Sequence, residues 1–503
     1  MFDLRTLITT TCLGLVLVST ASAAVIDVYV TSSADSGPGT LRQAILDANA
    51  NDLDNNDTHI RIQLNNNDPI DLTADLPTIT ARVITIAGDS AYYPRINGGS
   101  SHAMFRTNSS VLLFALRNLD LELGQSAADR GGCVEFVSDG SINIENVSFF
   151  GCEARGDPTA SGGAIYATGT VQINDSQFFT NYANGNTSAW GGAIFHDDPN
   201  GQLTILDSQF NGNHAVAIAV TASAIGGAIY SRAETRIERS ALLSNAARTP
   251  GREGGNLAGG IYISNGSLAL FRSTLISNHA SSGGAISFDQ NATVTQVNID
   301  LRNNLFVLNV AETNKGGALN SHNGMLSLRN NTFWHNRAAG SGENFYGATN
   351  SVIAQASNNL FMAGDGNHGS CDGFTTVNPT TDSVYNILPA AECGMGAGPG
   401  DQINQDVGII GLEYDAAAPG QAYLWLVQDS PAIEGANPST PDDADPYACP
   451  ELDGPGNTRP ALGIGIPGNG PPVPARCDIG AWESPGEAPL FYDDFEDPLH
   501  GYN

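Results

Sequence analysis

Short runs in which apolar and polar residues alternate cover most of the chain from residue 81 to residue 363. The runs are rich in Val, Ile, Phe and Thr, and clusters of Gly, Asn and Ser separate them, so the pattern predicts short β-strands joined by turns. No amphipathic helical period runs through this region. We therefore expect an all-β architecture here.

Two signatures recur along this region and divide it into repeats. The first is a Gly-Gly pair followed by a small and then an aliphatic residue, and the second is an apolar residue three positions before an asparagine. The Gly-Gly pairs recur at intervals of 24 to 35 residues and begin at Gly131, Gly162, Gly191, Gly226, Gly259, Gly283 and Gly316. The second signature comprises Phe178–Asn181, Phe210–Asn213, Leu242–Asn245, Leu275–Asn278, Phe306–Asn309 and Phe333–Asn336.

A repeat of this size is too small to bury its apolar face alone, but stacked copies can bury one continuous core. The repeats therefore predict a right-handed parallel β-helix, in which each coil rests on the previous one at a spacing of about 4.8 Å. The recurrent asparagines should form an amide ladder at a turn. The position after Gly-Gly-X should form an interior column, namely Val134, Ile165, Ile194, Ile229, Tyr262, Ile286 and Leu319.

Both ends of the chain depart from the repeats. Residues 40–49 begin with a Thr-x-x-Gln capping box and form the one convincing helical pattern. We expect this helix to cover the open end of the stack, within an N-terminal cap at 24–80. The repeats are predicted to span 81–363, and 364–484, rich in Gly and Pro, to form a loop-rich module held by disulfides. Residues 485–503 form an acidic-aromatic tail.

The first 23 residues have the pattern of a secretory signal peptide. Arg5 provides the positive start, Leu7–Val18 is an apolar core too short to span a bilayer, and Ala21–Ala23 is a small-residue cleavage site. No later segment is apolar enough to cross a membrane. We therefore expect a protein secreted to the extracellular space or the outer cell surface, with no transmembrane segment in the mature chain.

Six cysteines follow the signal peptide, and an even number in an exported chain favours disulfides. Cys133 replaces the alanine of Gly-Gly-Ala and Cys152 replaces the ladder asparagine, so both belong to one coil. The alternative for this pair is two separate buried thiols. Many connectivities are open to six cysteines, and we predict pairing between sequence neighbours, as Cys133–Cys152, Cys371–Cys393 and Cys449–Cys477.

The Gly-Gly-Ala-Ile and Phe-x-x-Asn repeats resemble those of chlamydial polymorphic outer-membrane proteins and related bacterial β-helix proteins. Near the start, Gly39–Ala44 resembles the CSLREA motif of many such secreted proteins, with departures at Gly39, Thr40 and Gln43. These resemblances imply a β-helix and export to the cell surface, and they imply no particular reaction. Near the end, three segments resemble the choice-of-anchor Q module: Asp429–Ile433, Arg459–Pro460 and Asp478–Glu483. Leu490–Glu496 resembles the acidic-aromatic tail of some exported gammaproteobacterial proteins.

The chain carries a formal net charge of −31 at pH 7. Such a surface repels nucleic acids and anionic lipids, so nucleic acid is not expected as a partner. We predict no cofactor and no metal site. Calcium would suit the acidity, but the acidic residues are scattered and the sequence contains no calcium-binding loop motif.

A column of polar residues contains the best candidates for catalysis. Aligning the coils on the ladder asparagine places Asp175, Asp207 and Arg239 on three consecutive coils. The two aspartates would lie about 5 Å apart, which suits the carboxyl pair of a retaining glycosidase, and Arg239 could bind a uronate carboxylate. The alternative is structural, because this is a turn position at which Asp often bonds to its own backbone. Six arginines lie between residues 232 and 272, but interleaved glutamates favour an ion-pair network.

Tyr166, Phe195 and Tyr230 fall in the column next to the interior one. Strand alternation predicts that they face outward as an aromatic strip that could bind sugar rings or a partner protein, and the alternative places them in the core. His196–Asp198 contains an acidic doublet like that of polygalacturonase-like glycosidases. The companion Gly-His-Gly and Arg-Ile-Lys motifs are absent, so a turn is the simpler interpretation.

These observations favour a secreted or cell-surface protein that acts in adhesion or in binding a partner protein or glycan, without enzymatic activity. The alternative is a polysaccharide lyase or glycoside hydrolase that acts on an extracellular polysaccharide through Asp175, Asp207 and Arg239. A purely structural role in a surface layer is a third interpretation that the sequence leaves open.

Overall fold

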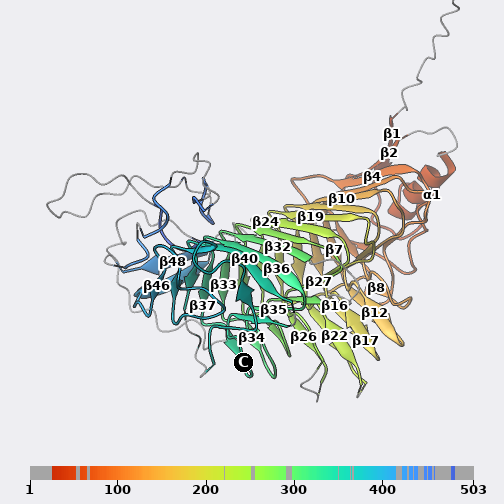
Figure 1. Cartoon of the computed structure of the whole chain (residues 1–503). Coiled ribbons are helices and arrows are strands. Elements are labelled where there is room, and N and C mark those ends of the chain that lie inside the picture. The colour runs from red at the N-terminus through yellow and green to blue at the C-terminus, as the bar shows by residue number, and fades with distance from the viewer. Residues whose placement is uncertain are drawn as a thin grey trace, which may run out of the picture.

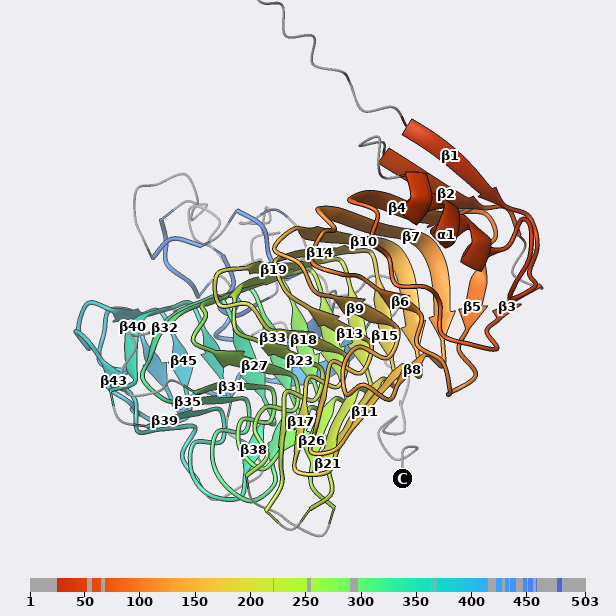
Figure 2. The ribbon, with the colours of Figure 1, turned by 90° about the vertical axis from the view of Figure 1, so that its right-hand side faces the viewer.

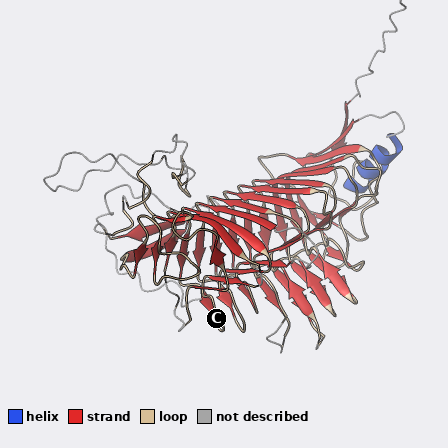
Figure 3. Ribbon diagram, in the orientation of Figure 1, coloured by secondary structure: helices blue, strands red, loops and turns tan. Residues whose placement is uncertain are grey.

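The computed structural model describes residues 25–481, except 52–56, 65–67, 220, 251–254, 290–296, 349, 363, 365–367, 415–421, 428–429, 434, 440–446, 450, 456–457 and 459–476. The predicted signal peptide and the predicted acidic-aromatic tail lie outside the described residues. Within the described part, the chain is a parallel β-helix of about 12 turns with one α-helix, α1 (Leu41–Asn51) (Figures 1 and 3). The predicted fold class is confirmed.

Two long parallel sheets form the walls of the coil (Figure 1). The larger has 25 strands: β1 (Val25–Val30), β2 (Asp57–Ile62), β3 (Ile70–Asp71), β4 (Val83–Gly88), β5 (Arg95–Asn97), β7 (Leu113–Glu122), β10 (Ser141–Phe150), β14 (Thr170–Asn174), β15 (Gln177–Phe179), β19 (Gln202–Leu206), β20 (Gln209–Asn211), β24 (Glu234–Glu238), β25 (Ala241–Leu243), β28 (Leu268–Phe271), β29 (Thr274–Ile276), β32 (Val297–Arg302), β33 (Leu305–Val307), β36 (Gly324–Arg329), β37 (Thr332–Trp334), β40 (Val352–Ser357), β41 (Leu360–Phe361), β43 (Thr375–Thr376), β44 (Ser383–Val384), β45 (Ile387–Leu388) and β46 (Gln402–Ile403). The second has ten strands: β6 (Phe105–Arg106), β9 (Val134–Phe136), β13 (Ile165–Ala167), β18 (Ile194–His196), β23 (Ile229–Ser231), β27 (Ile261–Ser264), β31 (Ile286–Asp289), β35 (Leu319–Ser321), β39 (Phe345–Gly347) and β42 (Cys371–Asp372).

The remaining strands form three smaller sheets. An eight-stranded parallel sheet contains β8 (Gln125–Ser126), β11 (Glu153–Gly156), β16 (Tyr182–Gly185), β21 (His214–Ala217), β26 (Ala246–Arg248), β30 (His279–Ala280), β34 (Val310–Ala311) and β38 (Arg337–Ala338). A three-stranded sheet contains β12 (Thr159–Ser161), β17 (Ser188–Trp190) and β22 (Ser223–Ile225), and an antiparallel hairpin contains β47 (Ile409–Tyr414) and β48 (Ala422–Leu426).

The interior aliphatic column is confirmed, with one correction. Ile165, Ile194 and Ile229 stack in register and are fully buried, as predicted. In the next coil, however, Ile261 takes the interior position and Tyr262 pairs with Tyr230. The prediction was one residue out of register because Ala258, at φ +56°, takes the place of the first glycine of the pair. Glycine is usual there because the turn needs a positive φ, as at Gly226 (φ +68°).

The amide ladder is also confirmed. The Asn181 amide donates to the Asn213 side-chain oxygen over 2.9 Å, and the same contact repeats down the column to Asn336. Each of these asparagines is fully buried, so each bond stabilises a group that would otherwise be buried without a partner. A second ladder was not predicted. Its members are Ser176, Ser208, Ser240, Ser273, Asn304, Asn331, Asn359 and Asn386.

Helix α1 covers the N-terminal end of the core, as predicted. The Thr40 hydroxyl accepts a hydrogen bond from the backbone N–H of Gln43 over 3.3 Å, which is the N-cap contact expected of a capping box. Its buried residues Leu41, Ala44 and Ile45 join the main core. α1 lies beside β1 and β2 at one end of the molecule (Figure 2).

The stack continues beyond the predicted boundary at residue 363. Strands β42 to β46 pair in parallel with the preceding coils, so regular coils extend to Ile403. The boundary was placed too early because the repeat signatures disappear before the stack does. Loop-rich chain begins only after β46.

All three predicted disulfides are present: Cys133–Cys152, Cys371–Cys393 and Cys449–Cys477. Cys133 and Cys152 have Cα atoms 5.6 Å apart and belong to the core. The first two bonds join residues within the coils, and the third joins two segments of the loop-rich chain.

The insertions in the longer coils form a thin two-layered projection, which we call the alanine fin. It consists of β11, β16 and β21 facing β12, β17 and β22 (Figure 1). Its two layers lie so close together at the turn from β11 to β12 that only glycine fits there. A Cβ on Gly156 would lie 1.7 Å from the carbonyl oxygen of Thr159. The buried alanines between and beside the layers are Ala154, Ala160, Ala183, Ala189, Ala215, Ala217, Ala222, Ala224, Ala247 and Ala280.

Candidate functional site

The three catalytic candidates lie in one column of turn residues on the larger sheet. Asp175, Asp207 and Arg239 each separate two strands of that sheet and have φ values of +48°, +49° and +48°. Strand register on both sides of the turn places them directly above one another. The predicted alignment and turn position are therefore both correct. We call the whole set the turn column: Asn118, Asn146, Asp175, Asp207, Arg239, Arg272, Asn303, Asn330 and Asn358, all with φ between +46° and +57°.

Arg239 is held by carboxylates on two sides. Its Nε and Nη2 donate to the two oxygens of Asp207, each over 2.6 Å, and its Nη1 donates to Glu238 over 2.7 Å. Glu238 also accepts from Arg236 over 2.6 Å and from Arg272 over 2.5 Å. The guanidinium groups hold the pKa of Glu238 below its usual value even though burial opposes this. The predicted ion-pair network is confirmed for these described residues.

Asp175 differs from the other two candidates. In the described part of the chain its carboxylate has no hydrogen bond or ion pair. Burial, followed by the negative charges of Asp207 and Glu145, raises its pKa, and Arg239 partly offsets this effect. The structure therefore brings all three candidates together, but Arg239 faces Asp207 rather than an open space.

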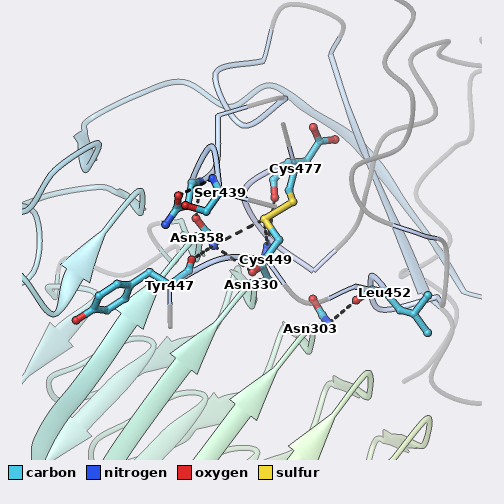
Figure 4. Close-up of a disulfide and its surroundings, with 10 residues drawn as sticks. Asn303, Asn330, Asn358, Ser439, Tyr447, Cys449, Leu452 and Cys477 are labelled. Atoms are coloured by element: carbon cyan, nitrogen blue, oxygen red, sulfur yellow. Dashed lines mark hydrogen bonds between the residues drawn. A yellow bond between two sulfur atoms is a disulfide. The ribbon is translucent and has the colours of Figure 1, made fainter. Parts of the chain in front are cut away.

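Backbone groups of the chain's own C-terminal segment bind the asparagine side chains at one end of the turn column (Figure 4). The Asn303 amide donates to the carbonyl oxygen of Leu452 over 2.7 Å, and the Asn358 amide donates to that of Tyr447 over 3.1 Å. Asn358 also accepts from the backbone N–H of Asn437 over 2.9 Å. We call the described residues between 407 and 481 the docking segment. The Cys449–Cys477 disulfide lies next to Asn330 and Asn358, whose side-chain amides lie 4.0 and 3.9 Å from the Cys449 sulfur (Figure 4).

Apolar contacts accompany these hydrogen bonds. Leu305 and Val307, which face outward from β33, are covered by Ala422 of the hairpin. Leu360 and Ile387 pack against the region around Cys449 and Cys477. The docking segment therefore covers both the turn column and the outward face of the strands beside it, over the last coils.

The coils before the docking segment present the same face, which we call the open face. Phe150 is 46% exposed, and Phe179 and Leu243 are partly exposed in the same outward column. On the other side of the turn column, the Arg236 and Arg302 guanidinium groups lie 4.9 and 5.3 Å from the ring centroid of Phe271. The open face also contains six charged residues, namely Asp175, Asp207, Arg236, Glu238, Arg239 and Arg272.

The aromatic strip faces outward from the coil, but the expectation that it is exposed is wrong. Tyr166, Phe195 and Tyr230 are only 4%, 3% and 8% exposed. The alanine fin folds against them, and Trp190 lies 5.7 Å from Phe195 between ring centroids. The rings do face away from the coil interior, as strand alternation requires, but an insertion covers the surface that alternation exposes. Tyr262 belongs to the same cluster, and the repeated Ile-Tyr pairs could have revealed this.

The His196–Asp198 triplet has structural contacts throughout. Asp197 accepts from the Tyr166 hydroxyl over 2.8 Å and from Arg232 over 2.6 Å. Asp198 accepts from the backbone N–H of Asn200 over 2.9 Å, as expected for a turn. His196 is fully buried against the carbonyl oxygen of Gly169, and burial lowers its pKa.

Comparisons with known proteins add no family to this description. No protein-family model and no curated protein sequence matches the chain. Among the described residues, no cluster of His, Cys, Asp and Glu could hold a metal ion, and no helix is long and apolar enough to cross a membrane.

The sequence did not identify the outward aromatic residues of the open face. The pattern that could have found them is the pair Phe149–Phe150, in which the first ring is buried and the second must point outward. The docking surface for the C-terminal segment left no local sequence signal, because asparagine also occupies the turn column at Asn118 and Asn146, far from that segment.

Proposed function

We propose that this chain is an exported binding protein that acts in adhesion or partner recognition through its open face, without enzymatic activity. The observation that carries the proposal is the open face itself, an uncovered continuation of a surface that already binds a polypeptide segment further along the stack. Exposed aromatic and arginine side chains, which the open face combines, are enriched at protein interfaces. The signal-peptide pattern and three disulfides support export to an oxidising compartment.

The arrangement around Arg239 argues against catalysis at this position. A residue that binds a uronate carboxylate needs open guanidinium donors, whereas Arg239 already binds Asp207 through two nitrogens and Glu238 through the third. A substrate would have to displace both carboxylates. The network is therefore better suited to fixing the shape of the face than to turning over a substrate.

One observation favours glycoside hydrolysis as a second candidate function. Asp175 has a raised pKa beside Asp207, which is paired with Arg239. Two neighbouring carboxyl groups whose environments differ in this way can divide the roles of acid and nucleophile. This candidate predicts that Asp175 and Asp207 are both needed for turnover.

One experiment separates the two proposals. Purified protein starting at residue 24 is assayed for product release and for retention on polygalacturonate, alginate, xylan and β-glucan, and protein-coated beads are assayed for attachment to cultured cells. We expect wild-type protein to attach to cells and to release no product from any of the polysaccharides. Phe179→Asp should reduce this attachment at least fivefold. The control Arg155→Ala, on the alanine fin, should leave it unchanged. Turnover lost in Asp175→Asn and Asp207→Ala would contradict the binding proposal, as would attachment indifferent to Phe179→Asp.

A further inference from the structure

Strand β1 forms an open edge at the N-terminal end of the larger sheet. It pairs in parallel with β2, from Val25 opposite Asp57 to Val30 opposite Ile62, and no described strand pairs with its other side. Figures 1 and 2 show β1 as the outermost described element at this end. Helix α1 covers the core beneath it and leaves the edge itself uncovered.

The backbone directions show which groups face the open side. The carbonyl oxygen of Val30 accepts from the N–H of Gln63, so Val30 points toward β2, and the N–H of Thr31 points away, toward Gly39. Because backbone groups alternate along a strand, those of Val25, Asp27 and Tyr29 face the open edge. They form a row of donors and acceptors ready for another strand.

The side chains of β1 do not protect this edge. Natural edge strands are usually blocked by charged side chains, above all Lys, by Pro or by a bulge. β1 contains no Lys, Pro or bulge, and its one charged residue, Asp27, is paired with Arg61 of β2 over 2.6 Å. Val25 and Tyr29 are 56% and 49% exposed, and Leu46 on the adjacent helix is 46% exposed. An uninterrupted six-residue strand with this exposure is suited to receiving a partner strand.

We propose that the β1 edges of two copies of this chain pair in antiparallel fashion and form a dimer about a two-fold axis at Val28. In this register, inward side chains of one copy lie opposite inward side chains of the other, as Ile26 does opposite the second copy's Val30. Outward side chains likewise lie opposite outward ones, as Asp27 does opposite the second copy's Tyr29. A register shifted by one residue would put inward side chains opposite outward ones. An axis at Asp27 would put two carboxylates opposite each other.

Charge complementarity favours a second copy as the occupant of this edge. Asp27 binds Arg61 over 2.6 Å, and Arg61 is the β2 neighbour of Tyr29. In the proposed register, Asp27 of each copy lies opposite Tyr29 of the other and in line with that copy's Arg61 one strand further on, so the shared outward face carries both charge signs and sets no two carboxylates opposite each other. A strand pair of this length buries less than a standard interface, so we expect a dissociation constant on the order of 10 µM.

The test is sedimentation velocity of the protein starting at residue 24, from about 1 to 200 µM, which brackets the expected constant. Wild type should shift from monomer to dimer, and Tyr29→Pro should remain monomeric, because its N–H faces the open edge and contributes no bond to β2. Tyr29→Thr, the matched control, keeps that N–H and should still dimerise.

A second variant guards against a folding defect. Val25→Lys combined with Tyr29→Lys changes only exposed side chains and should weaken dimerisation at least tenfold while leaving the thermal midpoint unchanged. Wild-type protein that stays monomeric at 200 µM, or a Tyr29→Pro variant that dimerises like wild type, would overturn the proposal. The outcome is independent of the open-face proposal, because β1 lies outside that face.

Discussion

At the residue scale, single buried asparagines join each coil to the next. The Asn245 amide donates to the carbonyl oxygen of Phe210 over 3.1 Å and to the Asn278 side chain over 3.0 Å, and its oxygen accepts from Asn213. All four bonds are buried. A hydrogen bond of this kind contributes modestly when made, but a buried group left without its partner is costly.

Asn245→Ala should therefore destabilise the protein more than its size suggests. The change leaves the buried backbone N–H of Asn213 without its acceptor and removes one bond each from the Phe210 carbonyl and the Asn278 side chain, which together cost about 2–4 kcal/mol. The measurement is the urea midpoint followed by circular dichroism. Asn200→Ala, at an exposed turn, is the control and should leave the midpoint unchanged. Equal midpoints for both variants would show that the ladder does not stabilise the stack.

At the element scale, the alanine fin holds one histidine, His214, in a half-buried position on β21. His214 on β21 stacks on the ring of Tyr182 at 5.2 Å between centroids. Burial and, to a lesser extent, the positive charge of Arg248 lower the pKa of His214 to about 4. The neutral imidazole is therefore the form that the folded fin accommodates.

This pKa predicts an acid sensitivity of the fin. The unfolded chain takes up a proton near pH 6.5 and the folded chain only near pH 4, so stability is fully present above pH 6.5 and falls as the pH drops between these values. The loss can reach about 3 kcal/mol at its lower end. His214→Gln should reduce the difference in thermal midpoint between pH 7 and pH 5, whereas the exposed control His322→Gln should not. An unchanged difference in His214→Gln would contradict this account.

At the scale of the whole molecule, the stack is nearly one-dimensional, because each coil contacts mainly its two neighbours. Damage at one end should therefore remain local. The capping helix offers a direct test, since Ile45 is fully buried while Leu46 beside it is 46% exposed.

Ile45→Asp should accelerate amide hydrogen exchange in β1, β2 and β4 while leaving β36 to β41 protected. A buried carboxylate at this position costs several kcal/mol and loosens the cap. Leu46→Asp on the same helix is the matched control and should exchange like wild type. Faster exchange throughout the stack would show that the coils unfold as one cooperative unit.

The repeat signatures were sufficient for most of the architecture but not for the state of the candidate site. Asp175, Asp207 and Arg239 were aligned correctly, because a stack converts a fixed sequence offset into a vertical column. That Arg239 binds Asp207 could not be predicted, because the direction of a long side chain depends on its neighbours on adjacent coils. Tyr262 was misplaced because the first turn residue, Ala258, is not glycine.

The sequence by itself determined the coils, the two predicted columns and the three disulfides, because each of these depends on residues that recur at regular spacing or lie near one another along the chain. Only the tertiary structure decided which surfaces stay uncovered. The alanine fin buries the aromatic strip, and the docking segment buries the asparagine end of the turn column. The open face and the β1 edge, by contrast, remain exposed. The physical reason is that burial is a property of segments meeting in space, and these segments carry no periodic signal that ties them to the surfaces they cover.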